Sequence, residues 1–188
     1  MSSSDRDADH LQAGMDLPGL VLPATDGSDV CLAEIPGRSV VIVYPWTGRP
    51  GHPNPPDWDQ IPGAHGSTPE LEGFRNRHAD FLRLGARLIG LSRQTTAYQQ
   101  ELAARLALPF PILSDAEGRF AAALALPTFA TVGCIYLKRL TLLIRGGRIE
   151  TVFYPVPDAA GHAAEVLLWL GAQPTSPQRG EVGRDPAE

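Results

Sequence analysis

The chain has 188 residues, which is enough for one domain with a substantial hydrophobic core. It carries 21 Asp and Glu against 16 Lys and Arg, a formal net charge of -5, and no basic block, so nucleic acid is not expected as a partner. No apolar run reaches the length of a membrane span, so no membrane association is expected. The polar, acidic start MSSSDRDADH is unlike a signal peptide, and the expected location is cytoplasmic.

The two cysteines, Cys31 and Cys134, lie in apolar stretches and do not form a C-x-x-C pair. Their spacing argues against a disulfide framework, a zinc site and a thioredoxin-type dithiol. We expect both thiols to be buried and inert. The histidines lack metal-ligand spacing and no phosphate-binding glycine loop is present, so no metal or organic cofactor is expected.

The N-terminal part of the chain predicts a tail followed by a hairpin and a buried strand. Residues 1–13 lack hydrophobic periodicity and are expected to be disordered. An extended segment at 17–23, turn residues at 25–28 and a short return strand at 30–32 predict the hairpin. The run 39–44, Ser-Val-Val-Ile-Val-Tyr, is apolar without alternation and predicts a strand covered on both faces, as in an α/β sheet.

A loop rich in Gly and Pro follows this strand and leads to a helix predicted over 68–84. Ser67 or Thr68 can cap this helix, and Pro69 suits its first position because a missing N–H costs nothing there. If Ser67 is the cap, Glu70 completes a capping box. A strand end, a loop and a helix start together form a frequent site of chemistry, because the helix offers unpaired N–H groups and a partial positive charge.

The second half of the chain continues the α/β pattern. A buried strand at 85–92 follows the helix and predicts a right-handed crossover with a parallel strand pair. Thr95 or Thr96 can cap the next helix, predicted over 96–106. The remaining expected elements are an extended segment at 112–115, a helix at 116–124, strands at 135–144 and 149–154 joined by a tight turn, a helix at 159–170, and a loose tail from 173 to 188.

These elements and several motifs resemble the peroxiredoxins, in particular the bacterioferritin comigratory protein and the alkyl hydroperoxide reductase types. The segment GSTPELEGFR, residues 66–75, is similar to the family's GCTPE…FR, with Ser67 where the peroxidatic cysteine would be. The string GLSRQTTAYQQELAARLALPFPILSD, residues 90–115, is similar to another stretch of the family. The resemblance covers residues 15–171.

The resemblance implies a thioredoxin-like α/β fold with a central mixed sheet flanked by helices and an N-terminal β-hairpin. The domain would span 14–172, between disordered tails at 1–13 and 173–188. The gap between strand and helix is far longer than is usual in the family, so residues 48–63 resemble an insertion over the active site. This insertion can be a lid, a specificity wall or a dimer contact, or simply a surface loop stiffened by proline.

The resemblance also implies a thiol-dependent peroxidase that reduces hydrogen peroxide or organic hydroperoxides. A thiolate must attack one peroxide oxygen, and a second thiol must then reduce the sulfenic acid. A serine hydroxyl does not ionise near neutral pH and has no equivalent redox cycle. The chain is therefore expected to be an inactive Ser67 form, engineered or natural. The alternatives are a non-catalytic binding or sensor protein, or Ser67 acting only as a helix cap.

Further site residues follow from the same resemblance. Arg139, in the segment KRLTLLI, is similar to an arginine that stabilises the thiolate, although a solvated strand face is its alternative place. Pro45 would shield the site. The family's hydroxyl residue three positions before the cysteine is Ala64 here, and Thr47 is expected to take over its role. The predicted site consists of Ser67, Arg139, Thr47 and Pro45 as catalytic residues, with Gly66 and Thr68 as substrate-binding residues.

The expected partners are a peroxide and an external thiol reductant, namely thioredoxin, glutaredoxin or a small thiol. Some relatives have a second cysteine five residues after the first, but Glu72 stands there, so a cysteine at position 67 would act alone. A homodimer is a further expectation from the family. Hydrolysis through Ser67 and His65 is disfavoured because the G-x-S-x-G motif is absent.

Overall fold

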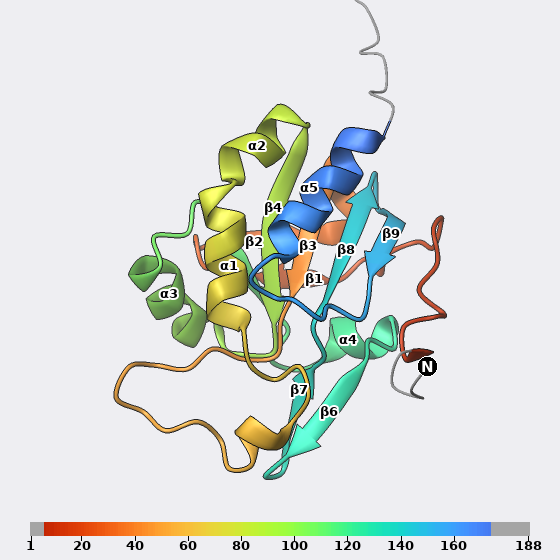
Figure 1. Cartoon of the computed structure of the whole chain (residues 1–188). Coiled ribbons are helices and arrows are strands. Elements are labelled where there is room, and N and C mark those ends of the chain that lie inside the picture. Colours follow the sequence, from red (N-terminus) through yellow and green to blue (C-terminus); the bar gives the residue numbers. More distant parts are fainter. Residues whose placement is uncertain (1–5, 174–188) are drawn as a thin grey trace, which may run out of the picture.

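The computed structural model describes residues 6–173 and is built around a five-stranded sheet with the order β5-β4-β3-β8-β9 (Figure 1). β3 pairs in parallel with β4 and antiparallel with β8, so the sheet is mixed, as expected. The buried runs predicted around 39–44 and 85–92 form its central strands. The strands of this sheet are β3 (Arg38–Val43), β4 (Ala86–Ser92), β5 (Ile112–Ser114), β8 (Leu140–Arg145) and β9 (Arg148–Phe153).

Both faces of the sheet are covered, because successive residues of β3 point to opposite sides and its last four residues, 40–43, are all apolar and buried. Val40 and Ile42 pack with the helices α1, α2, α3 and α5, whereas Val41 and Val43 pack with α4 and the N-terminal segment. Figure 1 shows α1, α3 and α5 on the same side of the sheet. The helices are α1 (Ser67–Asn76), α2 (His78–Arg83), α3 (Thr96–Arg105), α4 (Arg119–Ala123) and α5 (His162–Ala172).

Two of the predicted helices differ from the structure. The helix expected over 68–84 is two helices, because Arg77 between α1 and α2 leaves the helical region with φ of -111°. The helix expected over 116–124 is shorter and begins after Gly118, whose φ is positive. The Thr95 cap of α3 is confirmed, since its hydroxyl accepts a hydrogen bond from the N–H of Tyr98.

Two hairpins lie outside the main sheet. The predicted N-terminal hairpin is confirmed as β1 (Val21–Pro23) paired with β2 (Asp29–Cys31). The single strand expected over 135–144 is wrong, because the chain leaves the sheet ladder before β8. Its first part is β7 (Cys134–Leu137), which pairs with the unpredicted strand β6 (Thr128–Thr131) in a separate hairpin.

The N-terminal segment and the cysteines correct two further predictions. Ala8 and Leu11 are buried in the core, so this part of the predicted disordered tail is packed. The rest of the two predicted tails, 1–5 and 174–188, lies outside the described residues. The expectation of buried thiols is wrong, since Cys31 is half-buried and Cys134 is exposed.

No helix within residues 6–173 is long and apolar enough to cross a membrane.

Candidate active site

Ser67 is the first residue of α1, and its side chain is 2% exposed. The N-cap is Gly66 with φ of 103°, so the expectation that Ser67 or Thr68 caps the helix is wrong. Pro69 occupies the third helical position rather than the first, where an N–H is still not required. Glu70 does not complete a capping box, because its carboxylate pairs with an arginine instead. The Ser67 hydroxyl is therefore free of a capping role.

Arg139 reaches Ser67 from the segment just before β8. Its Nη2 donates hydrogen bonds to Ser67 Oγ at 3.2 Å and to the backbone oxygen of His65 at 2.9 Å. Its Nη1 forms an ion pair with Glu70, and the arginine is only 5% exposed. The alternative of a solvated strand face is therefore excluded, and it is the neighbouring Lys138 that forms a surface ion pair.

Glu70 is the buried counter-ion of this arginine. It is fully buried, and its Oε1 has no hydrogen-bond partner in the part of the chain that the structure describes. Burial raises the pKa of Glu70 from 4.5 to about 7, while the charge and hydrogen bond of Arg139 oppose this shift. The net charge of the pair beside Ser67 therefore changes near neutral pH.

Thr47 forms hydrogen bonds with two residues, Gln94 in the segment that leads into α3 and Tyr98 in α3 itself. The Thr47 N–H and hydroxyl both donate to Gln94 Oε1, at 3.2 and 3.1 Å. Gln94 Nε2 in turn donates to the backbone carbonyl oxygen of Thr47 at 3.2 Å. The hydroxyl of Tyr98 donates to the same oxygen at 2.9 Å. Because the Thr47 hydroxyl proton is used by Gln94, its lone pairs remain to accept a hydrogen bond from a ligand.

A cavity of about 230 Å³ brings most of the predicted site together. Arg139 contacts Ser67 but does not line the cavity. Pro45 does not line it either and borders a neighbouring hollow of about 380 Å³ together with Arg93, Gln94 and Cys134. The cavity beside position 67 is lined by Trp46, Thr47, Gly48, Asn54, Trp58, Ala64, His65, Gly66, Ser67, Thr68 and Pro69.

The insertion 48–63 is anchored by Trp58, which is 2% exposed. The ring centroid of Trp58 lies 5.3 Å from that of Trp46, 5.7 Å from Phe129 and 5.0 Å from Tyr136. Phe129 and Tyr136 belong to the β6–β7 hairpin, so this aromatic cluster joins the insertion to the hairpin. Such ring pairs are stabilising beyond the area that they bury.

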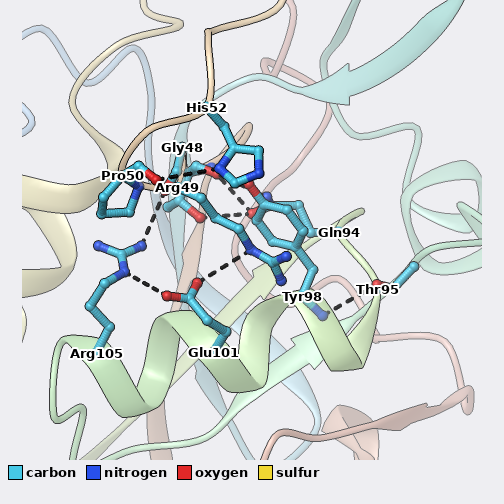
Figure 2. A network of polar contacts seen from close by, with 10 residues as sticks. Gly48, Arg49, Pro50, His52, Gln94, Thr95, Tyr98, Glu101 and Arg105 are labelled. Carbon is cyan, nitrogen blue, oxygen red and sulfur yellow. Dashed lines mark hydrogen bonds and ion pairs between the residues drawn. The ribbon is translucent and has the colours of Figure 1, made fainter.

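The start of the insertion is attached to α3 on its other side (Figure 2). Arg49 stacks over the ring of Tyr98, with 3.9 Å from its Cζ to the ring centroid, and pairs with Glu101 at 3.4 Å. Arg105 donates to the backbone oxygen of Gly48 at 3.1 Å and also pairs with Glu101. The insertion is therefore fixed on two sides, and it forms part of the cavity wall.

The comparisons with known proteins complete this description. The family model described as Redoxin matches residues 12–167. The chain belongs to the Redoxin family. Over 160 residues it is 24% identical to a putative peroxiredoxin bcp of Coxiella burnetii, covering 84% of this chain and 97% of that relative. A putative peroxiredoxin of Mycobacterium tuberculosis is 29% identical over 108 residues, which cover 57% of this chain and 59% of the relative.

Solved structures agree with this assignment to the Redoxin family. Peroxidoxin BcpB from Mycobacterium tuberculosis has a TM-score of 0.70 and 24% identity, with coverage of 87% of this chain and 98% of that chain. A cysteine-to-serine mutant of Xanthomonas campestris peroxiredoxin Q has a TM-score of 0.67 and 25% identity, with coverage of 85% and 97%. The thioredoxin-like fold of the peroxiredoxins is thereby shown for this chain.

Several residues of this Redoxin site were not found from the sequence. Glu70 was interpreted as part of a capping box, and Gln94 and Tyr98 carried no motif that marked them. In the sequence, only their positions drew attention to the two tryptophans: Trp46 lies just before the insertion 48–63, and Trp58 lies within it. All five are polar or aromatic residues whose role depends on contacts with distant segments.

The alternative chemistries find little support in the geometry. His65 Nε2 bonds to Asp59 Oδ1 at 2.6 Å on the surface, and no bond from its ring to Ser67 is found among residues 6–173, so a Ser-His pair is not formed. No group of three or more His, Cys, Asp or Glu side chains in the described chain is placed to hold a metal ion.

We expect Trp58→Ala to loosen the insertion. The substitution removes three ring contacts, so opening of residues 48–63 should become easier by about 1.4 kcal/mol or more, and cleavage in this loop should be at least about tenfold faster. Limited proteolysis with mapping of the cut sites measures this. Trp169→Ala, a change on α5 where Trp169 packs against Phe153, is the matched control and should leave loop cleavage unchanged. Equal cleavage in both variants would contradict the anchoring role of Trp58.

Proposed function

We propose that this chain is a peroxiredoxin-type thiol peroxidase whose peroxidatic position is occupied by Ser67, and that it is inactive in this form. The observation that carries the proposal is the contact between the buried guanidinium of Arg139 and position 67, which is the start of α1 and lines a cavity. Peroxide and a thiol reductant would be its reactants, in the cytoplasm.

The geometry suits a thiolate at position 67. The N-terminus of α1 and the Arg139 guanidinium both favour a negative charge there, and such surroundings lower the pKa of a cysteine from about 8.5. The thiolate would attack one peroxide oxygen, the O–O bond would break, and the departing oxygen would take up a proton as water or an alcohol. The sulfur would then carry a hydroxyl as a sulfenic acid.

Regeneration would require an external thiol. That thiol would displace water from the sulfenic acid to give a mixed disulfide, and a second thiol would reduce this disulfide. Cys134 borders the neighbouring hollow, and Cys31 lies on β2 in the hairpin that packs on the other face of the sheet, so neither lines the cavity of position 67. Thioredoxin, glutaredoxin or a small thiol would fill this role, and a homodimer is part of the proposal.

A second candidate is a binding or sensor protein that has lost catalysis. It is favoured by one observation, which is that the serine chain still has a cavity lined by Ser67 and Thr47 and a buried arginine in contact with Ser67. Such a protein would bind a small ligand at the same place without oxidation.

The test compares peroxide consumption by the Ser67 chain and by its Ser67→Cys variant in stopped-flow experiments with excess dithiol. We expect the Ser67 chain to be inactive and the variant to consume peroxide, with a sulfenic acid at residue 67 identified by mass spectrometry. A Thr68→Cys variant, one position further along α1, is the matched control and should gain little activity. If a folded Ser67→Cys variant consumes no peroxide, the peroxidase proposal fails and the binding alternative remains.

A further inference from the structure

We propose that the outer edge of β6 is a contact surface for a second copy of this chain, and that two copies join their β6–β7 hairpins edge to edge into one continuous sheet. This inference builds on the homodimer that is part of the proposed function and names its contact surface, but it does not depend on the peroxidase chemistry. The hairpin is a separate two-stranded sheet that projects beyond the main sheet (Figure 1). It can therefore be extended by another strand without a change in the core.

The outer edge of β6 has backbone groups available for pairing. A two-residue turn joins the strands of the hairpin, and Thr131 pairs with Cys134 on either side of it. In such an antiparallel pair only alternate residues bond to the partner strand, so the N–H and C=O groups of Thr128 and Ala130 point away from β7. Both residues are exposed, and in the part of the chain that the structure describes β6 pairs with no strand other than β7. An edge of this kind is a template for another strand.

The distribution of charge favours a second copy as the partner. Charged side chains usually protect an edge strand from association, but the segment 120–137, which contains the whole hairpin, has no charged residue. The chain as a whole has a net charge of -5, so two copies repel each other at most orientations. The uncharged hairpin is a place where they can approach. The edge strands of the main sheet differ, because N-terminal residues cover them through bridges from Asp16 to Arg148 on β9 and from Ala24 to Leu113 on β5.

Val132, in the turn of the hairpin, is a residue that the isolated chain does not explain. Its φ is 50°, in the left-handed region where a β-branched side chain is strained and where Asn or Gly is usual in such turns. The side chain is 63% exposed, so it stabilises little within one copy, and the nearby Ile135 is also exposed, at 52%. Backbone strain that no contact within the chain offsets indicates a function for the side chain at that place. A contact with a second copy would cover this apolar tip.

A two-fold axis fixes the register of the proposed contact. If two β6 strands pair antiparallel about Phe129, Thr128 of one copy lies opposite Ala130 of the other, and the outward backbone groups of both residues find partners. Because the strands run in opposite directions, the tip that carries Val132 then lies along the residues that precede β6 in the second copy. Phe129 also packs against Trp58 of the insertion, so the contact would brace the strand that supports the insertion. A strand of four residues makes a small interface, and the dimer should dissociate on dilution.

The test is sedimentation equilibrium of the Ser67 chain over a wide range of concentrations. Ala130→Pro removes an N–H at the outer edge and leaves the bonds to β7 in place. Val132→Asn replaces the apolar tip by a residue that tolerates a positive φ. We expect each variant to raise the dimer Kd by about tenfold or more, while Val132→Asn does not lower the melting temperature. Val21→Asn is the matched control, since Val21 is also an exposed valine of a hairpin, at 54%, and it should leave the Kd unchanged.

The outcomes separate this inference from the proposed function. If the chain stays monomeric at every concentration, the inference is overturned. It is also overturned if a dimer forms and neither Ala130→Pro nor Val132→Asn weakens it, in which case the homodimer stands and its surface lies elsewhere. Peroxide consumption by the Ser67→Cys chain is measured separately. If that chain reduces no peroxide but the two hairpin variants weaken the dimer, the peroxidase proposal fails and the contact surface stands.

Discussion

Replacing Arg139 by methionine in the Ser67→Cys chain is expected to slow peroxide reduction by about 10²–10³-fold, the usual cost of removing one donor from a site of developing negative charge. Its Nη2 is the group that contacts position 67, at 3.2 Å from the serine oxygen. Without it, both the thiolate and the departing oxygen lose their nearest positive charge. Stopped-flow kinetics under pseudo-first-order conditions measures the loss.

At pH 8, where Glu70 is ionised, the same substitution should also lower the free energy of unfolding, by about 3–5 kcal/mol, because it leaves the buried Glu70 carboxylate without its partner. Lys138→Met is the matched control. Lys138 directly precedes Arg139 in the chain, but its ion pair, with Asp7, is exposed. It should leave the rate unchanged and the stability nearly so. An Arg139→Met rate within a few-fold of the Ser67→Cys chain would remove Arg139 from the mechanism.

Replacing Glu70 by glutamine is expected to remove a pH-dependent loss of stability. The folded state holds the Glu70 proton up to a pKa of about 7, whereas the ordinary value is 4.5. Between these two pH values the folded state binds more protons than the unfolded state, so the free energy of unfolding falls as the pH rises. The fall is on the order of 3 kcal/mol across this window.

Urea unfolding of the parent and the Glu70→Gln chain at pH 4.5 to 8 measures this difference. His162 acts in the opposite direction, because burial lowers its pKa and stability is lost as the pH falls below about 6.5. The difference between the two chains isolates Glu70, since His162 is present in both. Glu72→Gln, a half-exposed carboxylate on the same helix, is the control and should keep the parent's slope. An unchanged slope in Glu70→Gln would mean that Glu70 stays ionised throughout.

Much of the fold was predictable because continuous apolar runs mark strands that are buried on both faces. β3 and β4 were found in this way, and the crossover between them follows from the handedness rule. The break between α1 and α2 at Arg77 was missed, because the apolar spacing continues across it. The β6–β7 hairpin was missed because its residues join directly to the apolar run of β8.

The site was predictable only in part. The resemblance correctly indicated that position 67 and Arg139 would meet, although they are 72 residues apart. The burial of Glu70 beside them and the hydrogen bonds between Gln94 and Thr47 could not be predicted. A polar residue is expected at the surface, and only the packing of distant elements around it makes it part of a site.

The N-cap of α1 imposes a constraint that reaches across the chain. A Cβ atom built on Gly66 would lie 2.8 Å from the Cβ of Ala159, which is closer than two such atoms can approach, and its φ of 103° also suits glycine. The turn that presents position 67 is therefore closely packed against the segment that precedes α5. Substitutions at positions 66 and 159 are therefore coupled. A larger side chain at position 66 would require the backbone that orients residue 67 to shift, or the side chain at position 159 to become smaller. Gly66 and Ala159 should therefore stay small in any variant that keeps residue 67 in this orientation.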